Sequence, residues 1–356
     1  MSGKDIYPKE KQAGLTRRQF LRLAGGALGA AAVMPLANWT SAYAAEDESV
    51  RIYAPPASLG RIATWGVEIR QEPSPEAKLV RTAQKDEVLK LRGQCEGTPV
   101  MPHNDVWYAT DDGYTYSSWV QPVEDIQNRA QPDKAAEKFW GELTVPFSDS
   151  RRQPDPKAAR FMRLYYTGIF RVVEAVAGKD RQWWYRLQDG ITYSPGPYVP
   201  AAHIRRLAPS ELTPISPAVA NKRVEVNLKE QTITAYENGY PVLTSRVASG
   251  FGIHYTPRGE HTVLWKSPAS RMIGGVGADY YDLPGVPFPT YITSSGVAIH
   301  GTYWHNDFGR PRSHGCLNVP SPVARWFWRW TLPSAPYDDA IYRTPKDIKG
   351  TLVNVS

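Results

Sequence analysis

Cysteine is scarce in this sequence of 356 residues, which contains only Cys95 and Cys316. Two cysteines cannot form a disulfide framework, and they cannot supply a zinc or iron–sulfur site that needs four cysteine ligands from one chain. Charged residues (22%) and hydrophobic residues (42%) occur at ordinary frequencies. These values exclude a mainly disordered chain, a collagen-like repeat and a membrane protein with many spans.

Clusters of basic residues are missing after the first 44 residues. Residues 1–44 contain six Lys or Arg and two Asp or Glu, which gives +4 of the total net charge of +7. The remaining chain therefore has 36 basic and 33 acidic residues. Because no basic run or RNA-binding signature accompanies this balance, we expect no DNA or RNA partner.

Proline, glycine and aromatic residues are abundant, with 31 Pro, 28 Gly, 12 Trp and 20 Tyr. Frequent Pro and Gly favour short strands joined by tight turns over long helices. A chain of this length commonly folds as two or three domains. The composition therefore predicts a mainly β protein with more than one domain.

The N-terminus has the order of segments found in export signals. The pair Arg17-Arg18 comes first, an Ala- and Gly-rich stretch at 23–34 follows, and the small residues Ala42 and Ala44 come next. The apolar stretch is shorter than the roughly 20 residues that span a bilayer. The assembly resembles a Tat export signal over residues 1–45, which implies cleavage, export to the cell wall or periplasm, and no membrane span afterwards. An uncleaved signal acting as an anchor and a basic cytosolic tail are the alternatives.

An eleven-residue motif occurs twice in the first two thirds of the chain. Residues 107–117 and 184–194 agree at seven positions, including a Trp-Tyr pair and an Asp-Gly turn. The duplication indicates two copies of one β unit, each with a hairpin. The pattern over 61–123 resembles the small barrels of bacterial SH3-like domains, and 160–208 resembles them less closely, which implies a role in binding or spacing at the cell wall. The simpler alternative is that the aromatic residues only fill two cores. A short helix is expected near 134–143.

From residue 222 the sequence alternates between apolar and polar residues, as half-buried strands do. Strands are expected at 222–228, 232–237 and 240–249. A Ser-Pro pair then predicts a capped helix at 321–330, whose three Trp residues are expected in the core. The last third of the chain is therefore expected to form a separate β-rich domain.

A Gly- and Pro-rich segment at 268–289 interrupts this last part of the chain. Segments of this length are seldom passive connections. We therefore expect it to form a lid that contains Met272, Tyr280 and Tyr281.

A short apolar strand ends at His300, and a polar loop sixteen residues later contains Cys316. The pKa of a free thiol is about 8.5, so a nucleophilic cysteine needs a neighbouring base or positive charge near neutral pH. His300 is the candidate base. The residues around the cysteine are expected to assist it: His314 as an orienting group, Ser313 as a partner of an imidazole nitrogen, the amides of Gly315 and Cys316 as an oxyanion hole, and Asn318 as a support for the loop.

Two stretches carry a family resemblance, Ile-His-Gly at 299–301 and Ser-His-Gly-Cys-Leu-Asn at 313–318. Together they look like the active-site signature of the L,D-transpeptidase catalytic domain, the YkuD-like family. The resemblance covers 222–356 and implies a β-sandwich-like catalytic domain with a short helix. Gly301 stands where many relatives have Ser, so any side-chain role there would pass to the backbone. The residues expected to face the substrate are Gly301, Asn318, Arg312, Tyr291 and Met272.

The resemblance also implies a reaction. Cys316 would attack the carbonyl between the third and fourth residues of a peptidoglycan stem tetrapeptide, release D-alanine, and pass the acyl group to an amine of a neighbouring stem. Hydrolysis of the same thioester would make the enzyme an L,D-carboxypeptidase instead. No cofactor is implied, and acylation by a carbapenem is expected. The sequence leaves the oligomeric state open.

Three other interpretations use the same residues. A metal site could be built from His300, His305, His314 and Cys316, but a fully coordinated thiolate would not act as a nucleophile, and we expect no metal. A cysteine peptidase of the NlpC type generally has its cysteine before its histidine, which is the opposite order. A wall-binding protein with an inactive catalytic domain would need a defect in the motif, and the motif is intact. Cys95 is expected to be a half-buried thiol in the first β unit.

Overall fold

The computed structural model describes residues 52–188 and 195–356, all within one compact unit. The expected export signal at 1–45 lies outside these residues, as do positions 189–194 of the second motif copy. The described chain consists mainly of strands, with two α-helices, α2 (Pro132–Ala136) and α3 (Ser321–Trp330). None of its helices has the length and apolar character required to cross a bilayer. The expectation of a mainly β protein is confirmed.

The first β unit is a seven-stranded sheet with the strand order β3-β2-β6-β5-β4-β1-β7. It begins at Leu59 and ends at Val123, close to the expected 61–123. Its apolar core includes Ile62, Val67 and Tyr108. The strands are β1 (Leu59–Ile62), β2 (Val67–Arg70), β3 (Leu79–Ala83), β4 (Val88–Met101), β5 (Asn104–Thr110), β6 (Tyr114–Tyr116) and β7 (Val120–Val123).

The second β unit is also a seven-stranded sheet, with the order β10-β9-β13-β12-β11-β8-β14. It begins at Phe139, about twenty residues before the expected start at 160. The expected helix near 134–143 was wrong over its second half, because Phe139–Leu143 pairs with two other strands as β8. The strands are β8 (Phe139–Leu143), β9 (Phe147–Arg151), β10 (Arg160–Tyr165), β11 (Ile169–Ala177), β12 (Trp183–Gln188), β13 (Pro195–Pro200) and β14 (Ile204–Arg206).

The two β units have the same topology. Numbered within each unit, both sheets read 3-2-6-5-4-1-7. The repeated Trp-Tyr pair lies in the fifth strand of each, and Trp107, Tyr108, Trp184 and Tyr185 are all buried. The duplicated motif in the sequence therefore corresponds to a duplicated strand order, and its aromatic residues fill the two cores.

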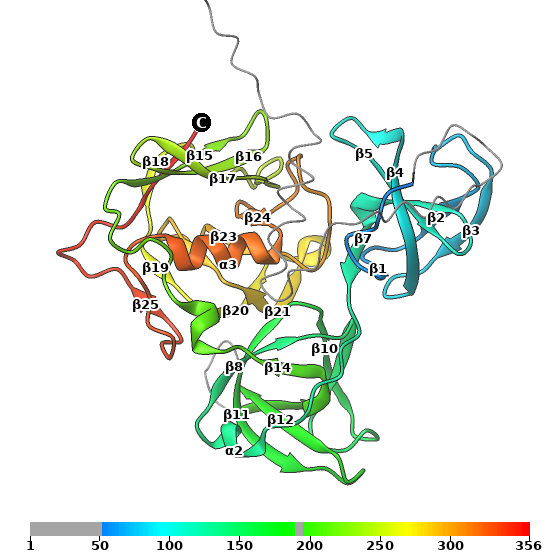
Figure 1. Cartoon of the computed structure of the whole chain (residues 1–356), viewed down its shortest axis with the longest axis horizontal. Coiled ribbons are helices and arrows are strands. Elements are labelled where there is room, and N and C mark those ends of the chain that lie inside the picture. The colour runs from blue at the N-terminus through cyan, green and yellow to red at the C-terminus, as the bar shows by residue number, and fades with distance from the viewer. Residues whose placement is uncertain (1–51, 189–194) are drawn as a thin grey trace, which may run out of the picture. The chain divides into compact units, whose positions relative to one another are not determined.

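The last domain contains two five-stranded sheets and a separate two-stranded hairpin (Figure 1). The sheet orders are β17-β16-β15-β26-β18 and β24-β23-β22-β19-β25. The strands are β15 (Lys222–Asn227), β16 (Thr232–Glu237), β17 (Tyr240–Arg246), β18 (Gly259–Thr262), β19 (Trp265–Lys266), β20 (Ala269–Gly274), β21 (Tyr281–Pro287), β22 (Thr290–Tyr291), β23 (Ala298–Gly301), β24 (Leu317–Val319), β25 (Tyr342–Arg343) and β26 (Leu352–Val355). Buried residues of both sheets and of α3 form one apolar cluster.

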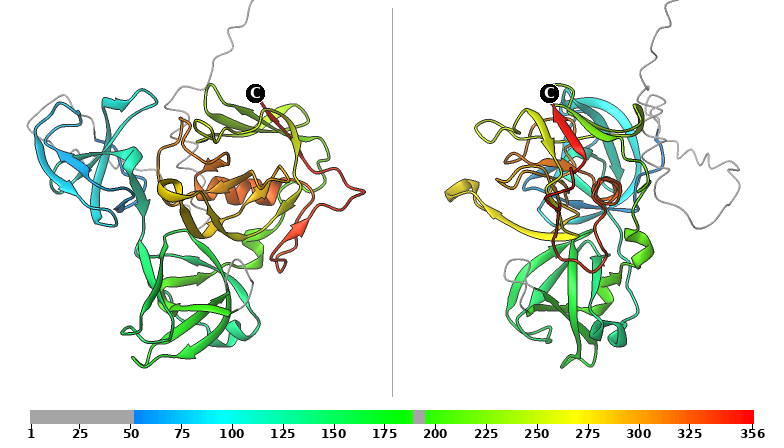
Figure 2. Two further views of the ribbon diagram at one scale, coloured as in Figure 1. Left: turned by 180° about the vertical axis from the view of Figure 1, so that it is seen from behind. Right: turned by 90° about the vertical axis from the view of Figure 1, so that its left-hand side faces the viewer.

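The segment expected to be a lid forms the hairpin of β20 and β21, with a 3-10 turn at Gly277–Asp279. Figure 2 shows this yellow hairpin extending away from the sheets of the last domain. Its tip carries exposed apolar side chains, with Val276 85% exposed and Tyr280 58% exposed. The segment is therefore a hairpin with an exposed apolar tip, and its function as a lid stays a prediction.

Helix α3 packs against β23 and supports the centre of the domain. Trp328 and Trp330 are fully buried, as expected. Ser321 does not cap the helix, because the N-cap is Pro320 and the Ser321 hydroxyl lies 2.9 Å from the Thr167 hydroxyl of the second β unit. At the other end, the buried Lys266 ammonium donates to the carbonyls of Trp328 and Thr331. A cation there complements the helix dipole, although burial lowers the pKa of Lys266 to about 7.

Candidate active site

The register of two neighbouring strands brings the backbones of His300 and Cys316 close together. Strands β23 and β24 are parallel, and His300 pairs with Asn318. Cys316 directly precedes β24 and lies two residues before Asn318. The pairing of the His300 and Cys316 side chains stays a prediction from the sequence.

The Cys316 thiol is half-buried and has backbone partners. Its Sγ lies 3.8 Å from the Gly296 carbonyl oxygen. Burial raises the pKa of Cys316 to about 11, and a hydrogen bond from the Ala298 backbone lowers it in part. Desolvation without a neighbouring positive charge has this effect on a thiol. Cys316 is therefore a protonated thiol at neutral pH in this structure.

The His300 ring is buried, and its Nδ1 lies 2.9 Å from the Gly301 carbonyl oxygen. A carbonyl only accepts, so Nδ1 carries the proton and Nε2 has a free lone pair. Burial lowers the pKa of His300 to about 4, against a smaller effect of the Gly301 hydrogen bond. Both shifts favour the uncharged forms of the His300 imidazole and the Cys316 thiol.

Ser313 and Gly315 hold the turn in which the cysteine lies. The Ser313 hydroxyl donates to the Cys316 carbonyl at 2.5 Å and accepts from the Gly315 amide at 3.1 Å. Gly315 has a φ of +110°, which favours glycine, and its carbonyl accepts a 2.8 Å hydrogen bond from Thr256. The expected contact of Ser313 with an imidazole was wrong, because its hydroxyl is used within the turn. The Gly315 amide is likewise engaged and is not a free oxyanion donor.

His314 points to the surface instead of towards His300. Its ring lies 4.4 Å from the His254 ring and 5.0 Å from the Tyr281 ring of the hairpin. The side chains of Phe251, Ile253 and Tyr255 are also exposed in the neighbouring loop. His314 therefore links that loop to the lid at the edge of the site.

Asn318 is buried and turned towards a second histidine. Its side-chain amide lies 3.1 Å from His305 Nε2, and His305 Nδ1 accepts from the Asp307 amide at 3.1 Å. Asn318 was expected both to support the loop and to face the substrate, and its burial fits only the first role. The described residues contain no group of three or more side chains arranged to hold a metal ion.

The remaining predicted substrate residues differ in accessibility. Gly301 is buried, and a Cβ there would meet the Pro287 Cβ at 2.9 Å, so packing accounts for this glycine and direct substrate contact was wrong. Tyr291 stacks on Trp265 at 4.5 Å, and Met272 is half-buried in the hairpin. Arg312 donates to Asp307 at 2.8 Å. Asp307 was not singled out from the sequence, where an isolated Asp in a loop gives no signal.

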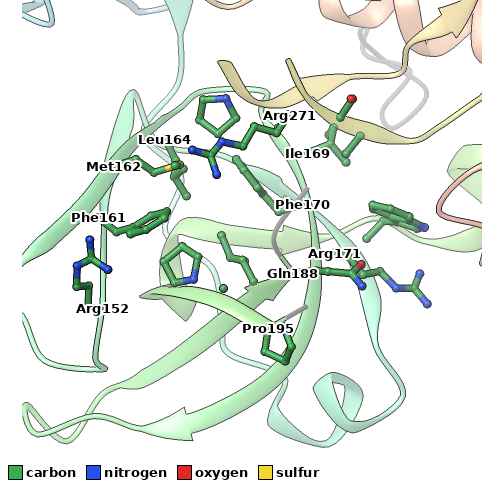
Figure 3. Close-up of a pocket in the computed structure, with 18 residues that line it drawn as sticks. Arg152, Phe161, Met162, Leu164, Ile169, Phe170, Arg171, Gln188, Pro195 and Arg271 are labelled. Carbon is green, nitrogen blue, oxygen red and sulfur yellow. The ribbon is translucent and has the colours of Figure 1, made fainter. Parts of the chain in front are cut away.

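A cavity of about 330 Å³ lies beside the second β unit (Figure 3). It is lined by the second β unit, including Phe161 and Phe170, and by the base of the hairpin, including Arg271. Neither His300 nor Cys316 lines it, so the chemistry of the cysteine is not located there.

Comparison with known proteins bears on the last domain. Residues 221–355 match the family model for the L,D-transpeptidase catalytic domain, close to the 222–356 expected from the motif. No curated protein matches the chain. Similar solved structures include the Ldtfm–avibactam carbamoyl enzyme (27% identity, 39% of this chain and 50% of that chain, TM-score 0.31). Others are an Enterococcus faecium L,D-transpeptidase (26%, 39% and 51%, 0.31) and one from Mycobacterium smegmatis (17%, 70% and 90%, 0.32). The chain spans about half the length of the first two.

Proposed function

We propose that this protein is a peptidoglycan L,D-transpeptidase that uses Cys316 as its nucleophile. The observation that supports the proposal is the parallel pairing of β23, which contains His300, with β24, which Cys316 directly precedes, within the residues that match the catalytic-domain family. Release of D-alanine from a stem tetrapeptide would form a thioester, and an amine of a second stem would resolve it into a 3→3 cross-link.

Because both members of the pair are uncharged, the proton passes from Cys316 to His300 during the attack and not before it. His300 Nε2 accepts the Cys316 proton as Sγ bonds to the carbonyl carbon, and the Nδ1 hydrogen bond to Gly301 stabilises the resulting imidazolium. Collapse of the tetrahedral intermediate breaks the carbon–nitrogen bond, and His300 protonates the departing D-alanine amine. In the second half the acceptor amine attacks the thioester, His300 takes its proton, and the thiolate leaves and is reprotonated.

The lid gives this reaction a means to exclude water. Tyr281 of the hairpin contacts the His314 ring two residues before Cys316. Exposed apolar side chains lie on both sides, at Tyr255 and at Val276. A stem peptide bound between them would shield the thioester from water, which favours transfer to an amine over hydrolysis. Hydrolysis by an open site would give the L,D-carboxypeptidase activity instead.

The same proposal covers the rest of the chain. The Tat-type signal would deliver the protein to the cell wall or periplasm. The two seven-stranded units would act there as SH3-like modules that bind or space the wall. Their shared strand order and the buried Trp-Tyr pairs support an origin as duplicated domains.

Mass spectrometry with a disaccharide-tetrapeptide tests the reaction. Release of D-alanine with a cross-linked dimer supports transpeptidation, and release without a dimer identifies a carboxypeptidase. A carbapenem tests the nucleophile, since similar solved structures are described with avibactam, imipenem and faropenem. Cys316→Ala is expected to abolish drug attachment. Cys95→Ala is the matched control, because Cys95 is buried in the core of the first β unit and removed from solvent, whereas Cys316 is half-buried. Drug uptake by Cys316→Ala equal to the wild type rejects the mechanism.

A further inference from the structure

The first β unit contacts the last domain on the chain segment that lies between His300 and Cys316. The Arg61 guanidinium donates to the Tyr303 carbonyl at 2.6 Å. Asn306 donates through its backbone to Ser118 at 3.2 Å and through its side chain to Ser117 at 3.1 Å. Tyr303 and Asn306 both belong to the segment 303–312, which connects His300 to Cys316. The first unit is therefore bonded to the chain segment that separates base and nucleophile.

His103 makes the most direct of these contacts. It lies in the turn between β4 and β5, and its Nε2 is 2.7 Å from Asp307 Oδ1. The His103 carbonyl accepts from Arg246 of the last domain at 2.5 Å. Gly309 has a φ of +107°, and a Cβ at this position would lie 3.4 Å from the His103 ring. The absence of a side chain at Gly309 therefore lets the turn of His103 pack closely against the segment 303–312, in addition to the hydrogen bonds between them.

The Asp307 carboxylate binds side chains from both the first β unit and the last domain. Its carboxylate is 1% exposed and accepts from Arg310 at 2.6 Å and from Arg312 at 2.8 Å, in addition to His103. Burial alone would raise the pKa of Asp307, but the hydrogen bonds from His103 and Arg310 outweigh it and hold the pKa below its usual range. An ionised, buried carboxylate depends on such partners. Loss of His103 would therefore disturb how Asp307 holds the two arginines.

The contacts continue from Asp307 to the nucleophile. Arg312 donates through its backbone to the Ser249 carbonyl at 2.8 Å, and it precedes Ser313 in the chain. The Ser313 hydroxyl in turn holds the Cys316 carbonyl. A continuous path of hydrogen bonds and one peptide link therefore runs from the first β unit to Cys316.

We propose that His103 is a positioning residue for Cys316 and acts through Asp307 and Arg312. The first β unit then completes the active site instead of serving only as a wall tether. This inference rests on the proposed function in one respect, that Cys316 is the reacting group. His103 itself touches no substrate.

Three full-length variants test this assignment. His103→Leu removes the donor to Asp307, and His103→Gln retains an amide N–H near the position of Nε2. Arg81→Gln is the matched control, because Arg81 forms exposed ion pairs with Glu87 and Asp112 within the first unit. The measurements are the maximal rate of carbapenem acylation, the drug concentration at half that rate, and the thermal unfolding midpoint.

His103→Leu is expected to lower the maximal acylation rate about tenfold, since small displacements of a reacting group carry large rate penalties. The half-saturating concentration should stay within about twofold, and His103→Gln should restore most of the rate. Arg81→Gln should match the wild type. An unchanged maximal rate in His103→Leu overturns the assignment, as does a His103→Gln variant that is as slow as His103→Leu while unfolding at the wild-type temperature.

Alkylation of Cys316 by iodoacetamide separates this inference from the proposed function. The reagent needs no wall substrate, and peptide mass mapping distinguishes Cys316 from the buried Cys95. If the wild type neither releases D-alanine nor reacts with the drug, the proposed function fails. A slower alkylation of His103→Leu than of Arg81→Gln still supports positioning in that case, and equal alkylation rates reject it.

Discussion

The two β units share one strand order but join the last domain through different chemistry. The second unit contributes Trp140, Ile169 and Leu207 to the apolar cluster that includes both sheets of the last domain, and it adds hydrogen bonds such as that from Trp140 to Tyr337. The cores of the first unit are separate clusters, and its contacts with the last domain include hydrogen bonds and an ion pair at Arg246 and at residues 303–309. A duplicated fold has therefore acquired two different attachments.

This difference teaches what each junction can contribute. Apolar burial is non-directional and proportional to area, so the apolar part of the second junction stabilises the chain without fixing any one atom. Hydrogen bonds to charged groups depend on distance and angle, so the first junction fixes geometry next to the site. We expect variants of the second junction to lower stability, and variants of the first to change the reactivity of Cys316.

Lowering the pH should produce the largest difference in stability between the two junctions. Burial lowers the pKa of His300 to about 4 and of His305 to about 3, against about 6.5 in the unfolded chain. As the pH falls below 6.5 the unfolded chain binds these protons first, so the stability that is present above pH 6.5 is lost progressively towards pH 4. The loss is about 3 kcal/mol from His300, with a further loss from His305.

Hydrogen exchange measures where this loss acts. When the segment 303–312 opens, the His305 Nδ1 that accepts from the Asp307 amide is released and can bind a proton, which stabilises the open state as the pH falls. Exchange in 303–312, corrected for the intrinsic pH effect, should increase between pH 7 and pH 4.5. Exchange in β8, which belongs to the apolar junction, should increase less. Equal opening of both segments would contradict the proposed difference between the junctions.

Trp140→Ala should have the next largest effect and act on stability alone. Trp140 is 3% exposed and also donates to the Tyr337 carbonyl at 2.8 Å. Truncating a buried Trp lowers the free energy of unfolding by about 3–5 kcal/mol. Denaturant unfolding measures this change, and Trp65→Ala, at a position 72% exposed, is the control. A loss of Cys316 acylation in the folded Trp140→Ala protein would show that this junction also positions the site.

Local sequence patterns predicted much of the last domain. The alternation after residue 222 predicted the strands β15 to β17 nearly to their ends. The motif around His300 and Cys316 lies at two parallel neighbouring strands, β23 and β24. These features are local because strand alternation repeats every two residues. The start of the second unit was missed, because its early strands do not repeat the marked Trp-Tyr and Asp-Gly pattern. Phe139–Leu143 pairs with β11 as a strand, although the charged residues that precede it are typical of a helix.

Tertiary contacts of the site lay beyond what sequence could predict. His103 and Asp307 are 204 residues apart, and neither belongs to a motif. From the sequence alone, the Ser313 hydroxyl could bond to several nearby groups. Only the geometry of the turn assigns it to the Cys316 carbonyl. The direction of the His300 pKa shift also lies beyond the sequence, since desolvation depends on the fold around His300 and not on the spacing of the motif.

Asp307→Asn tests the junction of the first β unit, where the contacts include hydrogen bonds and an ion pair. The variant keeps the size of the side chain but removes the charge that holds His103, Arg310 and Arg312. Hydrogen bonds to a charged group contribute more than neutral ones, so a loss of about 2 kcal/mol in the free energy of unfolding is expected. Carbapenem acylation of Cys316 should slow as well. Asp112→Asn, an exposed partner of Arg81, is the control. A stability loss with an unchanged acylation rate would reduce Asp307 to a structural role.

The smallest expected effect provides the strictest comparison. Ser321→Ala removes the hydrogen bond between the start of α3 and Thr167 of the second unit, which should lower the free energy of unfolding by about 1 kcal/mol. Like His103→Leu, it deletes a side-chain hydrogen bond between a β unit and the last domain, and the two variants differ in which unit loses its bond. Acylation of Cys316 should stay at the wild-type rate in Ser321→Ala and fall in His103→Leu. If both variants slow acylation in proportion to their lost stability, the junctions act only by holding the domains together, and the two attachments are equivalent for the chemistry.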